Sequence, residues 1–203
     1  MRFKSLQAAI SLFLVLTLVI LTPHTNAHST LDAAIIDVTP STNKAYVGET
    51  VAINVTVKNN GTESAEFSVT TFFGNLTDNY TIATLKTGQL EAGEEKILTF
   101  NWDTSNVKPC QNYTIKANCT VDDDPTPEDN ELVDGEVKIS ILADIDGDGK
   151  VDIQDLVLLV KAFGSDPEHP RWNQDADLNN NEKVDIIDLI IMLKNYGKMC
   201  ESP

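Results

Sequence analysis

The chain has 203 residues, with 15 basic against 31 acidic side chains and a formal net charge of −16 at pH 7. This balance argues against a nucleic-acid-binding protein, because phosphates must be neutralised by clustered Lys and Arg. It suits a protein that binds cations or stays soluble in a saline exterior. The length allows one medium domain or two small ones.

Residues 1–27 have the pattern of a secretory signal peptide. Arg2 and Lys4 precede an apolar run over residues 8–21, and small residues around Ala27 offer a cleavage site. The run is short for a membrane-spanning helix, which needs about 20 apolar residues; an uncleaved N-terminal anchor is the alternative. Cleavage would change the net charge to −18, because it removes two basic residues and no acidic one. We expect a secreted protein, extracellular or associated with the cell surface.

Residues 31–141 alternate apolar and polar side chains in the way that is typical of half-buried strands. Turn-forming residues separate seven such segments, which predicts an all-β, immunoglobulin-like sandwich. The Cys…Trp…Cys spacing of antibody domains is missing. Five aromatic residues fall at positions expected to pack the sandwich, namely Phe72, Phe73, Tyr80, Trp102 and Tyr113. The predicted strands are residues 34–38, 51–57, 66–73, 80–85, 96–102, 113–121 and 136–141.

The order of turns and strands in this region resembles the CARDB family, the cell-adhesion-related domain of prokaryotic surface proteins. The matching segments are residues 48–51, residues 55–61, residues 90–94 ahead of a strand that ends in Trp102, residues 113–117 and residues 129–131. The resemblance covers residues 31–141. It implies an adhesion or interaction role, and the family has no defined catalytic site to transfer.

A different pattern begins at Asp144, where residues 144–155 form a 12-residue loop of EF-hand type. Ca²⁺ is a hard cation that takes six to eight oxygen ligands, and such loops supply them from positions 1, 3, 5, 7, 9 and 12. Gly149 stands at position 6, where the backbone turns sharply. The predicted ligands are the side chains of Asp144, Asp146, Asp148, Asp152 (or a water that it holds) and Asp155, with the backbone carbonyl of Lys150.

A second loop follows at a constant offset of 33 residues. Such an in-register repeat is a strong signal, and we expect two calcium sites. Glu182 replaces the glycine at position 6, where a positive φ would strain it, and two ligands are neutral Asn. We therefore expect weaker binding by the second loop. Its predicted ligands are Asp177, Asn179, Asn181, the carbonyl of Lys183, Asp185 and Asp188.

Each loop is followed by a helical pattern, but neither is preceded by one. A strand precedes the first loop, and the proline-containing segment 166–170 precludes a helix before the second. This duplicated half-hand resembles the type I dockerin, a small calcium-dependent module that docks onto cohesin domains. The predicted domains are the sandwich at 31–141 and the dockerin at 142–197, with repeats at 144–164 and 177–197 and a tail at 198–203.

The helices after the two loops contain more apolar residues than a sixty-residue module can bury. We expect Leu156, Leu159, Val160 and Phe163 to face the module's core, and the opposite faces to bind the partner, with the more apolar second face dominating. Packing of these faces under the sandwich is the alternative. By resemblance, the partner-binding residues are Gln154, Leu158, Lys161 and Ser165, with Ile187, Ile191, Lys194 and Lys198 as their repeats.

The sandwich region also contains six Asn-x-Thr sequons and two of the three cysteines. Surface glycosylation is expected at some of the sequons. An odd cysteine count leaves one thiol free or in an intermolecular link. Cys110 and Cys119 cannot pair if they bracket a straight strand, and the pairing with Cys200 stays open. The sequons lie at Asn54, Asn60, Asn75, Asn79, Asn112 and Asn118.

Together these patterns predict a secreted, non-catalytic interaction protein that a calcium-loaded dockerin attaches to a cohesin-bearing surface or polysaccharide-degrading complex. A carbohydrate-binding accessory subunit is the first alternative. A small glycoside hydrolase is the second, because dockerins often accompany such enzymes. After signal removal the only histidines are His28 and His169, and no Ser-His-Asp or zinc constellation can be assembled.

Overall fold

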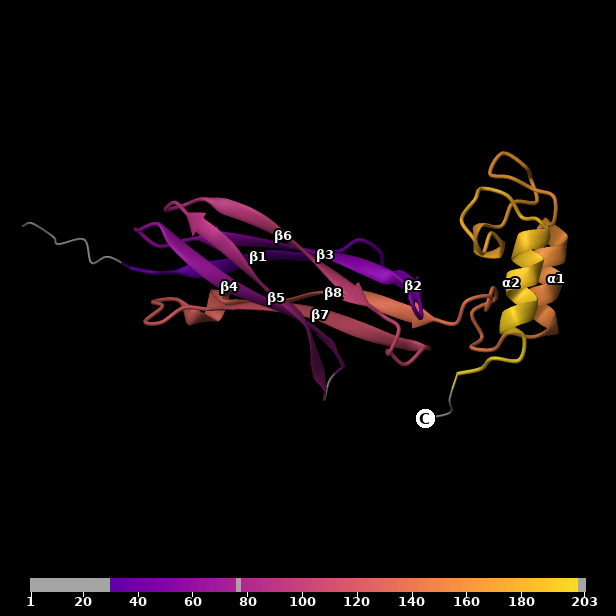
Figure 1. Ribbon diagram of the computed structural model, residues 1–203, viewed down its shortest axis with the longest axis horizontal. Coiled ribbons are helices and arrows are strands. Elements are labelled where there is room, and N and C mark those ends of the chain that lie inside the picture. Colours follow the sequence, from indigo (N-terminus) through magenta and orange to yellow (C-terminus); the bar gives the residue numbers. More distant parts are fainter. Residues whose placement is uncertain (1–29, 76–77, 201–203) are drawn as a thin grey trace, which may run out of the picture.

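The computed structural model describes residues 30–75 and 78–200 as an elongated β-sandwich with a small helical module at one end (Figure 1). The predicted signal peptide lies outside the described residues. The eight strands are β1 (Ala33–Pro40), β2 (Lys44–Tyr46), β3 (Thr50–Asn59), β4 (Ala65–Gly74), β5 (Asn79–Leu90), β6 (Glu95–Asp103), β7 (Gln111–Thr120) and β8 (Glu131–Ser140), with a 3₁₀ turn η1 (Pro127–Asp129) before β8.

Two sheets form the sandwich, a three-stranded sheet β1-β3-β6 and a five-stranded sheet β2-β8-β7-β4-β5. All pairings are antiparallel except that of β2 with β8. Alternate side chains enter the core: on β3 these are Val51, Ile53, Val55 and Val57, each almost fully buried. The predicted fold class is confirmed. The sequence prediction lacked β2, a three-residue strand too short to show alternation.

The helical module contains α1 (Ile153–Ala162) and α2 (Ile186–Asn195), with a 3₁₀ turn η2 (Gln174–Ala176) before the second loop. Each helix begins with a capping box, in which an N-cap aspartate and an aspartate three residues later bond each other's backbone N–H groups. The module has a hydrophobic core of its own, separate from that of the sandwich. No described helix is long and apolar enough to cross a membrane.

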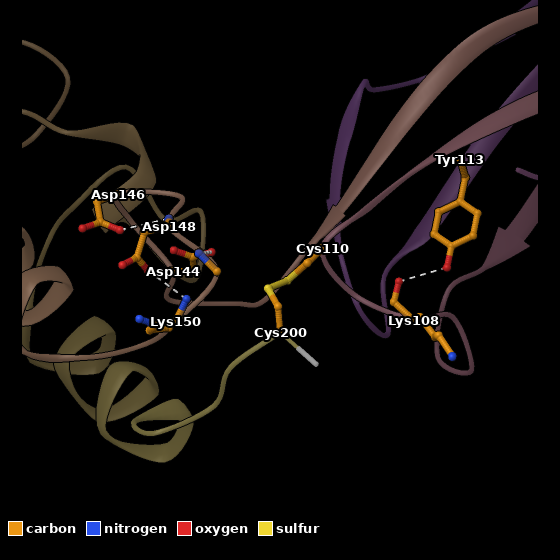
Figure 2. The surroundings of a disulfide bond; sticks show 9 residues. Lys108, Cys110, Tyr113, Asp144, Asp146, Asp148, Lys150 and Cys200 are labelled. Carbon is orange, nitrogen blue, oxygen red and sulfur yellow. Dashed lines mark hydrogen bonds between the residues drawn. A yellow bond between two sulfur atoms is a disulfide. The ribbon is translucent and has the colours of Figure 1, made fainter. Parts of the chain in front are cut away.

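A disulfide joins the two parts of the chain (Figure 2). Cys110, just before β7, pairs with Cys200, beyond α2, and their Cα atoms are 5.9 Å apart. This resolves the pairing that the sequence left open. Cys119 lies inside β7 as a free, buried thiol. Cys110 and Cys119 do not pair, as expected from a straight strand.

Candidate calcium centre

The first loop brings together three carboxylates whose oxygens lie within 4.8 Å of one another, those of Asp144, Asp146 and Asp155. Asp144 and Asp155 are buried. Among the described residues, none of the ion pairs involves these side chains. Buried like charges without a counter-ion are costly, and a divalent cation would offset this cost.

Backbone N–H groups hold these carboxylates in place. Asp155 Oδ1 accepts from Ile145 N at 2.7 Å and from Asp146 N at 3.1 Å, while its Oδ2 accepts from Asp152 N at 2.8 Å. Asp144 Oδ2 accepts from Gly149 N at 3.1 Å. The other oxygen, Asp144 Oδ1, is buried without a hydrogen-bond partner among the described residues. A buried acceptor with no donor suits a metal ligand, so the residues present fit Ca²⁺.

The electrostatics of Asp144 point the same way. Burial raises the pKa of this carboxyl, the hydrogen bond from Gly149 N opposes the rise, and the negative charge of Asp155 adds to it.

Figure 2 shows Asp144, Asp146, Asp148 and Lys150 grouped on the same turn. Asp148 Oδ1 accepts from Lys150 N at 2.9 Å, which orders the predicted ligand positions 5 and 7.

The second loop repeats part of this network with the same atoms, but Asp177 Oδ1, the counterpart of Asp144 Oδ1, accepts from Asn181 N at 3.1 Å. Asp188 Oδ1 accepts from Leu178 N at 2.8 Å, its Oδ2 accepts from Asp185 N at 2.7 Å, and Asp177 Oδ2 accepts from Glu182 N at 2.8 Å. Asp177 and Asp188 are buried like their counterparts. Asn179 Oδ1 and Asn181 Oδ1 accept from backbone N–H groups at 3.1 and 3.0 Å. The second loop therefore has the same shape with fewer negative charges.

Position 6 has a left-handed backbone in both loops. Gly149 has φ +86°, and Glu182, its counterpart, has φ +63°. The glycine adopts this region without a steric penalty, whereas an L side chain is disfavoured there. The expected strain at Glu182 is therefore present in the structure.

Position 9 has a second use in both loops. Asp152 Oδ1 accepts from Gln154 N, and Asp185 Oδ1 accepts from Ile187 N, both at 2.7 Å. These aspartates are the N-caps of α1 and α2. Their participation in metal binding, and that of the Lys150 and Lys183 carbonyls, stays a prediction.

The two loops also form one cross-connected unit, which sequence reasoning missed. Val184 in the second loop exchanges hydrogen bonds with residues 164 and 165, which follow α1, and Val151 in the first exchanges them with residues 197 and 198, which follow α2. Both valines are buried. The only sequence signal for this pairing is the repeated apolar residue at position 8.

The structure places the predicted partner-binding residues in different environments. Gln154, Lys161, Ile187, Lys194 and Lys198 are exposed, whereas Leu158 and Ile191 are partly buried against the module's core. The prediction for Ser165 is wrong as an accessible contact: it is only 2% exposed, and its hydroxyl donates to the carbonyl of Ala162.

The predicted core stripe is only half correct. Leu159 is buried and Leu156 partly buried, but Val160 and Phe163 are 55% and 40% exposed. The buried stripe of α1 is instead Asp155, Leu159 and Ala162. The exposed apolar residues recur at the 33-residue offset, as Ile153, Val157 and Val160 on α1 and Ile186, Ile190 and Leu193 on α2.

A surface depression of about 360 Å³ adjoins the exposed stripe of α1. It is lined by Asp146 from the first loop and by Ile153, Gln154, Val157, Leu158 and Lys161 from the helix. The three predicted contacts Gln154, Leu158 and Lys161 therefore lie on one concave surface next to the loop.

The predicted glycosylation sites lie on the sandwich. Five of the six asparagines are exposed, and Asn118 is half-buried within β7. Their modification stays a prediction.

The architecture is thus a β-sandwich followed by a duplicated loop–helix module whose first loop suits a cation. Two protein-family models match this sequence: CARDB matches residues 33–132, and the Dockerin type I domain matches residues 142–196. The chain thus combines a CARDB domain with a type I dockerin domain. Type I dockerins are calcium-binding modules with cohesin partners, so this chain has a calcium-binding, cohesin-docking type of module. No curated relative matches the chain.

Several solved structures are similar to part of this chain. The CARDB domain of a Pyrococcus furiosus protein in complex with di-metal ions is 22% identical, with a TM-score of 0.41, covering 55% of this chain and 94% of that one. A β-glucosidase from Erythrobacter marinus is 11% identical, with a TM-score of 0.43, and the match covers 54% of this chain and 15% of the glucosidase. A β-glucosidase from Listeria innocua is 18% identical, with a TM-score of 0.40, and the match covers 56% of this chain and 16% of the glucosidase. The chain spans about one-sixth of the length of these glucosidases.

Proposed function

We propose that this protein is a secreted, non-catalytic interaction protein, whose dockerin binds two calcium ions and then docks onto a cohesin domain. The observation that supports calcium binding best is the buried Asp144 carboxylate, one of whose oxygens lacks a donor while the other is held by the first loop. Docking depends on calcium in this proposal, because the loops set the positions of both helices through their capping boxes.

The docking surface that we propose consists of the exposed apolar stripes of α1 and α2, rimmed by Lys161 and Lys194. Exposed apolar residues surrounded by polar ones are typical of interaction sites. The α2 stripe also includes exposed Ile187, whereas its counterpart on α1 is Gln154. We therefore expect α2 to contribute more of the binding free energy.

The proposed lack of catalysis rests on the side chains available. His169, the one described histidine, lies in the linker between the repeats, and its Nδ1 accepts a hydrogen bond from Arg171 N at 3.1 Å. It has no serine or cysteine nucleophile as a hydrogen-bond partner among the described contacts. We expect the purified protein to be inert towards glycosidic, peptide and ester bonds.

Docking can be tested by titrating the full chain with a panel of type I cohesin domains, with calcium and with EDTA. The variant Ile187→Asp/Ile190→Asp places two charges in the proposed surface and should weaken binding at least tenfold, about 1.4 kcal/mol, with calcium uptake unchanged. Ile97→Asp, at an exposed apolar position on β6, is the matched control. Undiminished binding by the double variant would refute the surface, and binding in EDTA would refute the calcium dependence.

A further inference from the structure

A ladder of aromatic rings runs from the core of the sandwich to its surface. Trp102 on β6 is buried, and Phe73 on β4 stacks against it with centroids 4.7 Å apart and planes at 29°. Tyr80 on β5 stacks in turn against Phe73, at 5.3 Å and 25°. Tyr80 is nevertheless 54% exposed. The expectation that all the aromatics pack the core therefore holds for Trp102 and Tyr113 but not for Tyr80.

Next to the exposed end of this ladder the surface is hollowed. The cleft has a volume of about 300 Å³ and its lining residues include Phe73, Tyr80 and Tyr113, the last of which is only 5% exposed. Its other walls carry polar side chains, including Asn106 and Gln111 from the β6–β7 region and Asp78 from the β4–β5 turn. Such a volume is at the lower end of the range for small-molecule sites.

Three contacts hold the wall of the cleft that β6–β7 supplies. The hydroxyl of Tyr113 donates to the Lys108 carbonyl at 3.0 Å, and Cys110 is tied to Cys200 by the disulfide (Figure 2). Cys110 N also donates to the carbonyl of Ile139 on β8. A wall fixed in the free protein loses little entropy on binding, which favours affinity for a small ligand.

We propose that this aromatic cleft binds a pyranose unit of a polysaccharide. A sugar ring presents apolar C–H groups on its faces and hydroxyl groups around its edge. The aromatic side chains, Tyr80 above all, offer flat apolar surface for the faces. The side-chain amides of Asn106 and Gln111 can donate to and accept from the hydroxyls. A purely apolar ligand would leave these two amides without hydrogen-bond partners.

This proposal goes beyond docking and is independent of it. The cleft lies on the sandwich, and none of its lining residues belongs to the exposed stripes of α1 and α2. The protein would then have two binding functions, one for a cohesin and one for a polysaccharide. The proposals can fail separately.

The test uses the full chain produced without glycans, because Asn75, in a predicted sequon, also lines the cleft. Retention on insoluble cellulose, xylan and chitin is measured, followed by calorimetric titration with soluble oligosaccharides of whichever polymer binds. Tyr80→Ala should weaken binding at least tenfold, Tyr80→Trp should preserve it, and the control Ile97→Ala should have no effect. All three variants should bind cohesin like the unmodified protein.

Two outcomes would overturn the proposal. One is that none of the three polysaccharides retains the unmodified protein, even though it binds cohesin. The other is that a polysaccharide is retained equally well by the protein with Tyr80→Ala, which would place the binding elsewhere on the surface. Thermal unfolding of each variant shows whether the fold is intact.

Discussion

At the scale of single residues, position 6 distinguishes the two calcium loops most clearly. The backbone is left-handed in both, but the first loop uses Gly149 and the second uses Glu182. Gly147 and Asn180 show a milder version of the same contrast at position 4, with φ +75° and +56°. Asn tolerates this region better than most residues. The second loop therefore pays a conformational cost at position 6 that the first does not.

We predict that Glu182→Gly strengthens the second site. Removing a side chain from the left-handed region relieves about 1 kcal/mol of strain, which corresponds to about fivefold tighter calcium binding. Calorimetric titration of calcium into the full chain measures both sites. Gly149→Ala is the converse control and should weaken the first site, because a Cβ there would also meet Cys200 Sγ at 2.6 Å. Unchanged affinity in Glu182→Gly would contradict the strain argument.

The buried aspartate at position 12 should matter more than the half-buried ligand Asn179. Asp155 accepts from three backbone N–H groups, and each buried donor left unsatisfied costs about 1–3 kcal/mol. We predict that Asp155→Ala prevents the module from folding at calcium concentrations that suffice for Asn179→Ala. Circular dichroism during calcium titration compares the two variants. Equal calcium requirements would show that Asp155 does not organise the loop.

At the scale of elements, the sequence predicts strands better than helix faces. Alternation along β3 and its neighbours identifies the sandwich, because one face of each strand is buried. The short β2 depends on parallel pairing with β8, about 90 residues further along the chain, and has no local signal. The grouping of Asp144, Asp146 and Asp155 was predictable because metal coordination fixes the spacing of such loop carboxylates.

The buried faces of the helices were only partly predictable because the calcium loops determine how each helix is rotated about its own axis. Asp155 and Asp188 must point inward to their loops, although a polar residue suggests an outward position. Each helix therefore buries the stripe that contains this aspartate. Successive residues of an α-helix are rotated by about 100°, so Val160, which follows the buried Leu159, faces outward. Apolar periodicity alone does not contain this constraint. The pairing of Val151 and Val184 with the exits of the opposite repeats is equally non-local.

We predict that calcium removal unfolds α1 and α2 but leaves the sandwich intact. The two parts have separate hydrophobic cores, and calcium binding contributes to the folding free energy of the module that holds it. In EDTA, helical circular dichroism and the amide protection of residues 144–197 should be lost, while amides of β3 and β6 stay protected. Retention of the helical signal would show that the module folds without the metal.

At the scale of the whole molecule, the disulfide connects calcium binding to the sandwich. Cys200 N donates to the carbonyl of Gly149 at 2.8 Å, and Lys150 and Met199 form a β-bridge. The segment after α2 therefore lies along the first calcium loop, and Cys200 ties its end to Cys110 beside β7 (Figure 2). The first loop therefore lies beside a segment that the disulfide anchors, whereas no described segment beside the second loop is anchored by a disulfide.

We predict that breaking this disulfide destabilises the dockerin and weakens its first calcium site more than its second. The bond closes a loop of 90 residues, and cross-links of this kind typically contribute about 2–4 kcal/mol. The variant Cys110→Ser/Cys200→Ser should unfold at a lower temperature at fixed calcium, and reduced unmodified protein should match it. Thiol titration of the denatured, unreduced protein should find one thiol, that of Cys119.

That thiol supplies an internal check on the same experiment. Burial, together with the nearby Asp124 and Asp129, raises the pKa of Cys119 to about 12, so this side chain stays protonated at pH 8 and should react only after unfolding. Labelling of one thiol in the native protein would show that Cys119 is accessible. Labelling of three thiols would show that the disulfide is absent. If calorimetry gives the same first-site affinity with and without the bond, the tail beside Gly149 does not support the loop.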